Sequence, residues 1–117
     1  MGLDQYAFRD DGAGRSEIAY WRKHNRLQGW MASLYAEKGG TEEFNCLDLE
    51  LEGKDLDALE VAIQQRGLPA TVGFFYGNDS YGDYDSDDGY KVDDEAFIEK
   101  GRKVLADGHR LIYFCWW

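Results

Sequence analysis

The feature that most constrains this chain of 117 residues is the run from Ser16 to Lys38, which is compatible with a helix throughout. At about 100° per residue, its larger apolar side chains fall on one broad arc, as in a helix that packs against a core. We therefore expect one long helix, capped by Ser16 and closed by Gly39 and Gly40. The side chains on the arc are Tyr20, Leu27, Trp30, Met31, Leu34 and Tyr35.

A second stripe is expected along one edge of that helix. Its residues follow one another at helical spacing, and Asn25 lies beside them. A histidine in such a stripe can act as a base or metal ligand, although one at the edge of an apolar face is more often a hydrogen-bonded structural residue. We call this set the binding stripe and assign it no catalytic residue. It consists of Glu17, Trp21, His24, Asn25 and Gln28.

The rest of the sequence predicts several strands and two more helices. Apolar and acidic residues alternate from Phe44 to Glu52, which is typical of a strand with one solvated face. Residues 70–76 suit either a strand or an aromatic-lined loop. The other expected strands are Leu3 to Arg9 and Leu111 to Trp117, and the second of them is apolar on both faces. Two further helices are expected to begin at Asp55 and at Asp93 to Glu95.

This order of elements predicts an α+β fold. The half-polar strand from Phe44 to Glu52 favours a partly exposed sheet, mixed or antiparallel, over the parallel sheet of an α/β fold, which is the alternative. The length fits a single domain, residues 1–117, with three helices packed on that sheet.

The acidity of the chain is concentrated in one segment. The formal net charge is −10, and residues 79–95 contain eight acids and one lysine. We expect an acidic loop at about residues 78–95, which would repel phosphate backbones, so direct nucleic-acid binding is not expected and a basic protein is the favoured partner. Tyrosines among these acids are typical of protein interfaces. The predicted interaction residues are Asp79, Tyr81, Asp83, Tyr84, Asp85, Asp87 and Asp88.

The sequence predicts no cofactor and assigns no metal ligand. Asp83, Asp85 and Asp87 have the spacing of an EF-hand, but Asp88 stands where that motif requires glycine, so only a weak divalent-cation site in the loop stays open. No nucleophile elbow, HExxH, Walker A or GxGxxG motif is present. Cys46 and Cys115 are expected to be buried free thiols, and the absence of a long apolar run predicts a cytoplasmic protein that does not enter a membrane.

Three blocks of the sequence carry a resemblance. At MGLDQY, EIAYWRKHNRLQGWM and LPATVGFFYG, the chain resembles a family of small bacterial and bacteriophage proteins that has no established activity. The resemblance implies a cytoplasmic protein of bacterial or phage origin and carries over no catalytic residue.

Two functions are therefore weighed. The first is a non-catalytic acidic binding protein, such as a phage accessory or inhibitory factor, that engages a basic protein surface through the acidic loop. The alternative is a small enzyme or ligand-binding protein that uses the binding stripe. Self-association through Arg22 and Arg26, pairing with the acidic loop of another copy, would make a homo-oligomer.

Overall fold

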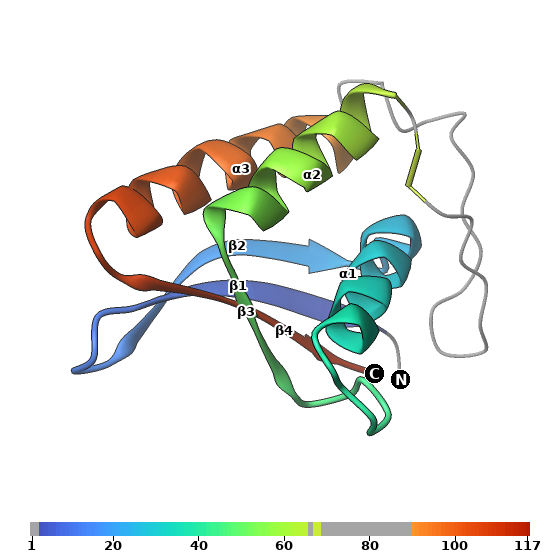
Figure 1. Cartoon of the computed structure of the whole chain (residues 1–117), viewed down its shortest axis with the longest axis horizontal. Coiled ribbons are helices and arrows are strands. Elements are labelled where there is room, and N and C mark those ends of the chain that lie inside the picture. Colours follow the sequence, from blue (N-terminus) through green and yellow to red (C-terminus); the bar gives the residue numbers. More distant parts are fainter. Residues whose placement is uncertain (1–2, 66, 69–89) are drawn as a thin grey trace.

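In the residues that the structure describes, a four-stranded antiparallel sheet carries three helices packed on it (Figure 1). The computed structural model describes residues 3–65, 67–68 and 90–117. The predicted α+β class is therefore confirmed, whereas the segment at 70–76 lies outside the described residues. The elements in order are β1 (Asp4–Asp10), β2 (Arg15–Arg22), α1 (Asn25–Glu37), β3 (Asp48–Leu51), α2 (Gly53–Gln64), α3 (Tyr90–Ala106) and β4 (Arg110–Trp116).

The expected helix from Ser16 to Lys38 is wrong in its first third. Residues Arg15–Arg22 form β2, which pairs with β1 through a hairpin, and α1 begins only at Asn25. The turn of the hairpin is fixed by the carboxylate of Asp11, which accepts hydrogen bonds from the backbone N–H groups of Ala13 and Gly14. Lys23, with φ of 56°, turns the chain from the strand into the helix. Ser16 is therefore a strand residue and caps no helix.

The sheet has the strand order β2-β1-β4-β3, so the first and last strands form its centre. β1 pairs with β4 in a continuous antiparallel register from Asp4 opposite Trp116 to Asp10 opposite Arg110. β3 is shorter than the predicted strand of residues 44–52, but its alternation is as predicted: Leu49 and Leu51 are buried, and Asp48 and Glu50 are exposed. β4 is apolar on both faces as predicted, and Ile112 and Tyr113 are fully buried, but Trp116 is 58% exposed, so burial of β4 on both faces holds only for the first part of the strand.

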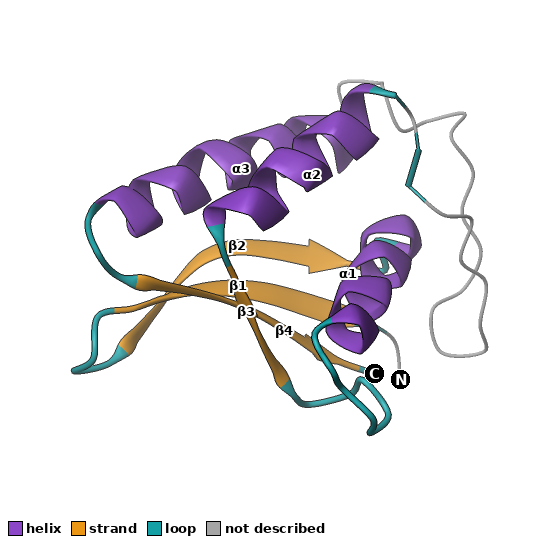
Figure 2. Ribbon diagram, viewed as in Figure 1, coloured by secondary structure: helices purple, strands orange, loops and turns teal. Residues whose placement is uncertain are grey.

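All three helices lie on one face of the sheet. α2 and α3 lie side by side over the strands, and α1 packs at the end of the sheet (Figure 2). Alternate residues of the strands, including Ala7, Leu49 and Tyr113, share one hydrophobic core with Leu27 of α1 and Phe97 of α3. In the part of the chain that the structure describes, no helix covers the opposite face, which we call the helix-free face.

The helix boundaries show which end signals were correct. α1 ends at Glu37, and Gly39 with φ of 97° follows, as the glycine pair predicts. α2 begins at Gly53, not at a capping Asp55: the carboxylate of Asp55 instead accepts a hydrogen bond from the backbone N–H of Glu52 at 2.8 Å. α3 begins at Tyr90, one turn before its predicted start, so the end of the predicted acidic loop is helical.

Candidate functional site

The structure separates the members of the predicted binding stripe. Glu17 and Trp21 lie on β2, whereas Asn25 and Gln28 lie on α1, and His24 precedes the helix. Glu17 is exposed, and the other four side chains are buried. The predicted helical stripe is therefore wrong as geometry, because the backbone changes from strand to helix in the middle of it.

Trp21 and His24 are nevertheless brought to one residue, Asp94 of α3. The indole Nε1 of Trp21 donates a hydrogen bond to Oδ1 of Asp94 at 2.9 Å, and Nε2 of His24 lies 2.8 Å from Oδ2. Asp94 and His24 are both 0% exposed. A buried carboxylate is stable only when such partners surround it, so this contact ties α3 to the junction of β2 and α1.

Tyr90 strengthens the same attachment one turn earlier on α3. Its ring stacks on the ring of His24, with centroids 4.1 Å apart and planes 4° apart, and its hydroxyl donates to the backbone oxygen of Arg22 at 2.6 Å. Tyr90, Asp94 and Phe97 lie at i, i+4 and i+7 on one helix face, and Phe97 packs edge-on against Trp21. The three residues together hold the strand-to-helix junction.

The sequence interpretation missed Asp94 and Tyr90 as partners of the stripe because it placed Tyr90 in the acidic loop and Asp94 where that loop ends and the third helix begins. The signal that could have found them is the spacing of Tyr90, Asp94 and Phe97, which continues the apolar face of α3 backwards by two turns. Among the acids of that segment, Asp94 is buried while Asp93 and Glu95 are exposed. Asp94 therefore cannot contribute to an acidic contact surface.

A second chain of buried hydrogen bonds crosses the core from β1 to β4. The amide nitrogen of Gln5 donates to the hydroxyl of Tyr113 at 2.9 Å, and that hydroxyl donates to Oε1 of Gln28 at 2.6 Å. The amide nitrogen of Gln28 in turn lies 3.3 Å from the sulfur of Cys115. Gln28 is thus bound within the core, and burial raises the pKa of the Cys115 thiol to about 11.

Cys46 and the pair of arginines Arg22 and Arg26 differ from what the sequence predicts. Cys46 is exposed and Cys115 is buried, and both are free, so the prediction of two buried free thiols holds for Cys115 only. Arg22 lies exposed on β2, whereas Arg26 is largely buried on α1 and donates to the backbone oxygen of Leu68 at 3.1 Å. The two arginines therefore do not form one exposed patch for self-association.

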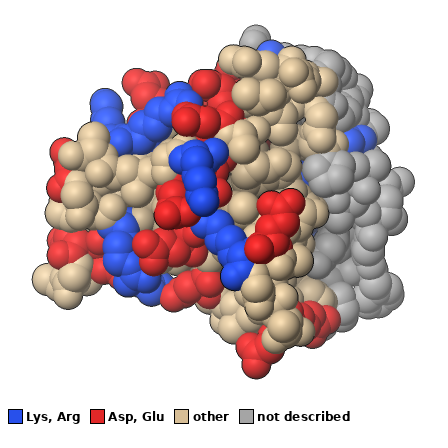
Figure 3. Space-filling view, viewed as in Figure 1, with Lys and Arg blue, Asp and Glu red and all other residues tan. Residues whose placement is uncertain are grey.

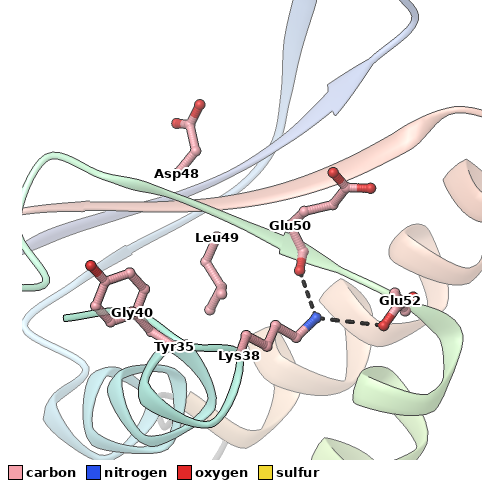
Figure 4. A pocket seen from close by; sticks show the side chains of 8 residues that line it. Tyr35, Lys38, Gly40, Asp48, Leu49, Glu50 and Glu52 are labelled. Atoms are coloured by element: carbon pink, nitrogen blue, oxygen red, sulfur yellow. Dashed lines mark hydrogen bonds and ion pairs between the residues drawn. The ribbon is translucent and has the colours of Figure 1, made fainter. Parts of the chain in front are cut away.

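The described surface has shallow clefts that are lined by structural residues. One lies between the end of α1 and β3, and Lys38 crosses it with Nζ 2.9 Å from the backbone oxygen of Glu50 and 3.7 Å from the carboxylate of Glu52 (Figure 4). Another, between β2 and α3, is lined by Glu17 and Trp21 but not by His24, Asn25 or Gln28. Neither cleft gathers the predicted binding stripe.

Charges of both signs share the described surface. On the side seen in Figure 3, Lys and Arg lie among Asp and Glu. Arg102, for example, bridges Asp57 and Glu60 between α3 and α2, and this arginine lowers the pKa of Glu60. Within the described ranges, no group of three or more His, Cys, Asp or Glu residues is placed to hold a metal ion.

Most of the predicted acidic loop lies outside the described residues. This applies to every predicted interaction residue of the segment, and to the calcium-like spacing within it. Of its remaining acids, Asp93 and Glu95 belong to the first turns of α3. The role of the acidic segment in binding a protein or a cation stays a prediction.

The helix-free face carries an ion-pair network at one end. Arg15 of β2 reaches across to Asp48 of β3 with two hydrogen bonds, of 3.1 and 2.7 Å, and its Nε lies 3.5 Å from Asp10. Arg110 of β4 binds Glu50 at 2.9 Å and approaches Asp10 at 3.5 Å. Ile112, which the strand register places on the same face opposite Phe8 and Glu50, is 0% exposed.

Aromatic side chains occupy the other end of that face. The ring of Tyr6 lies 5.9 Å from Phe8, 5.2 Å from Tyr20 and 6.3 Å from Phe114, centroid to centroid. Strand register places Trp116 on the same face, opposite Asp4. Tyr20 is 46% exposed and Trp116 58% exposed. We call these five aromatic residues the aromatic patch.

Sequence reasoning missed the aromatic patch, although its signal was present. Tyr6, Phe8, Phe114 and Trp116 alternate along two segments that were correctly predicted to be strands. What was missing was the pairing of β1 with β4, and the recognition of Tyr20 as a strand residue, because those two facts bring the rings together.

None of the described helices is long and apolar enough to cross a membrane. Comparison of the chain with models of protein families, with curated proteins and with solved structures finds no match.

Proposed function

We propose that this chain is a non-catalytic acidic binding protein that engages a basic protein surface, as an accessory or inhibitory factor. The observation that carries the proposal is the exposure of large aromatic side chains on the helix-free face, where Tyr20 and Trp116 are about half exposed. Contiguous apolar surface outside the core is a mark of protein interaction sites. The net charge of −10 favours a partner of opposite sign and speeds its approach.

The alternative of a small enzyme that uses the binding stripe has less support. Trp21, His24 and Gln28 are engaged in contacts within the core, and the cleft that Glu17 and Trp21 line does not include His24. A catalytic base needs access to its substrate. The buried polar groups are therefore better explained as supports of the fold.

The test compares the wild-type chain with a variant in which Asp83, Asp85, Asp87 and Asp88 are changed to Asn. Both proteins are immobilised and exposed to a bacterial lysate, and the bound proteins are identified by mass spectrometry. We expect the wild type to retain basic proteins that the variant binds less, with retention that falls between 0.1 and 1 M salt because charges are screened. Identical bound proteins in both samples, or bound proteins that are mainly acidic, would contradict the role of the acidic segment.

A further inference from the structure

The aromatic patch is a feature of the described surface to which the fold assigns no role. It lies on the side of the sheet opposite all three helices, and its rings belong to three adjacent strands, β2, β1 and β4. These strands are the long ones among the described strands of the sheet, and the ring of Tyr6 contacts those of Phe8, Tyr20 and Phe114. These four rings are therefore held together by the pairing of the strands.

The apolar side chains at the two ends of the helix-free face differ in their exposure. At one end Arg15 and Arg110 pair with acids of the same face, and Ile112 of that face is 0% exposed. At the other end Tyr20 and Trp116 are about half exposed. The apolar side chains of this face therefore range from fully buried at Ile112 to about half exposed at Tyr20 and Trp116.

The charges around the patch indicate what would bind there. The register of the strands places five acids and three arginines on the helix-free face, a net charge of −2. Two of the arginines, Arg15 and Arg110, are bound to acids of the same face. Near the rings there are Asp4, which accepts a hydrogen bond from the hydroxyl of Tyr20 at 2.7 Å, Glu17 and Arg22.

This composition suits cationic side chains. The faces of tyrosine and tryptophan rings attract guanidinium and ammonium groups, at about 0.5–1 kcal/mol for an exposed pair. Nearby carboxylates add to that attraction, whereas they repel the phosphates of a nucleic acid. A second copy of the chain would bring another net charge of −10, which opposes a face-to-face dimer.

We propose that the aromatic patch is the surface that receives arginine and lysine side chains of a basic partner protein. This inference rests on the proposed binding function and specifies where the partner is recognised. Tyr20 and Trp116 supply exposed rings, Tyr6 packs between Tyr20 and Phe114, and Asp4 supplies a carboxylate beside Tyr20.

The test uses a twelve-residue peptide of alternating arginine and serine, with a peptide of alternating glutamate and serine as its negative control. Binding is followed by tryptophan fluorescence and by amide chemical shifts of the 15N-labelled protein. We expect the arginine peptide to shift amides of β1, β2 and β4. Changing Tyr20→Ser and Trp116→Ser together should weaken its binding about tenfold. The matched control is Val61→Ser with Val92→Ser, since these exposed apolar residues lie on α2 and α3, and it should bind as the wild type does.

A further variant distinguishes this inference from the proposed function. In it, Asp83, Asp85, Asp87 and Asp88 are changed to Asn. If that variant loses the peptide while the patch variant binds normally, the patch is not the site although an acidic binding function stands. If the wild type binds neither peptide, or binds both equally, both proposals fail. A wild-type mass of two chains by light scattering, reduced to one by Trp116→Ser, would show that a second copy covers the patch and would overturn the inference. Should the double variant not fold, Trp116→Ser alone and the shift map of the wild type decide.

Discussion

At the scale of single residues, the carboxylate of Asp94 has the most consequential contacts. It is fully buried, and it accepts from the indole of Trp21 while lying 2.8 Å from Nε2 of His24. Replacement by alanine removes both contacts inside the protein, where water cannot replace them. The side chain therefore connects α3 to the end of β2 and the start of α1, about seventy residues earlier in the sequence.

We predict that Asp94→Ala lowers the free energy of unfolding by about 3 kcal/mol, measured by urea denaturation. Asp93→Ala is the matched control, because Asp93 is the preceding residue of the same helix and is exposed. Asp93→Ala should lower the free energy of unfolding by about 0.5 kcal/mol or less, which is what an exposed acid near a helix N-terminus typically contributes. Equal losses for the two variants would show that the buried contacts of Asp94 do not stabilise the fold.

The raised pKa of the buried Cys115 thiol lets us predict how the stability of the fold changes at high pH. Burial raises its pKa from 9.0 to about 11. As pH rises above 9, the unfolded chain loses the thiol proton first and is favoured, so the contribution of this thiol to stability falls between pH 9 and about 11. Hydrogen bonding of Tyr20 to Asp4 raises the pKa of Tyr20 as well. The effect of Cys115 must therefore be separated from that of Tyr20 by comparing the wild type with a variant that lacks the thiol.

The measurement is therefore the unfolding free energy of the wild type minus that of Cys115→Ala, from pH 8 to pH 11. We expect this difference to shrink by about 2 kcal/mol over that range. A difference that is independent of pH would mean that the thiol titrates alike in the folded and unfolded chain. Cys46→Ala serves as the control, since Cys46 is exposed.

At the scale of elements, the junction at Lys23 decides the course of the chain. Lys23 has φ of 56°, a conformation that costs an ordinary residue about 1 kcal/mol and costs glycine little. We predict that Lys23→Gly raises the free energy of unfolding by up to about 1 kcal/mol, and that the β-branched Lys23→Val lowers it by about 1 kcal/mol.

A continuous helix through residues 16–38 would give the opposite order. Glycine in the middle of a helix costs about 1 kcal/mol, more than valine does. Urea denaturation of the two variants thus tests the break at Lys23 directly, with Lys23→Ala as the neutral reference. Greater stability of the valine variant would argue against the strand-to-helix junction.

The same junction shows why the sequence predicted some elements and not others. The sequence predicted the glycine stop after α1, the alternation in β3 and the apolar β4, because these depend on local signals. The segment from Ser16 to Arg22 is compatible with a helix and with a strand. Tyr20 fits the helical arc and Trp21 the stripe beside it, but Ile18, Tyr20 and Trp21 are also favoured in strands. Pairing with β1 decides between them, and it is a contact that no local pattern contains.

Site prediction failed for a related reason. The stripe was correct in grouping Trp21 with His24, but the grouping arises from a shared partner on α3 rather than from one helix face. The aromatic patch depends on strands that lie about a hundred residues apart in the chain, with Tyr6 opposite Phe114. Sequence periodicity describes each strand separately and therefore gives no indication of the patch.

At the scale of the whole molecule, β4 is the element on which the fold depends. It pairs with β1 on one side and β3 on the other, and it contributes Leu111, Tyr113 and Cys115 to the core. Without it, β1 and β3 would have no common neighbour, and the helices would lose the centre of the surface they cover. A two-stranded remainder is marginally stable in water at best.

We therefore predict that a chain ending at Asp107 is unfolded at 25 °C, with no cooperative thermal transition by circular dichroism. The full-length variant Trp116→Ser is the control, because its altered side chain is 58% exposed and belongs to the same strand. This variant should keep the wild-type spectrum and a cooperative transition within a few degrees of the wild type, since substitutions at exposed sites usually change stability by about 0.5 kcal/mol or less. A cooperative transition in the truncated chain would show that β1, β2 and the helices form a core without β4. Unfolding of Trp116→Ser would instead mean that the aromatic patch stabilises the sheet itself and is not a surface kept for a partner.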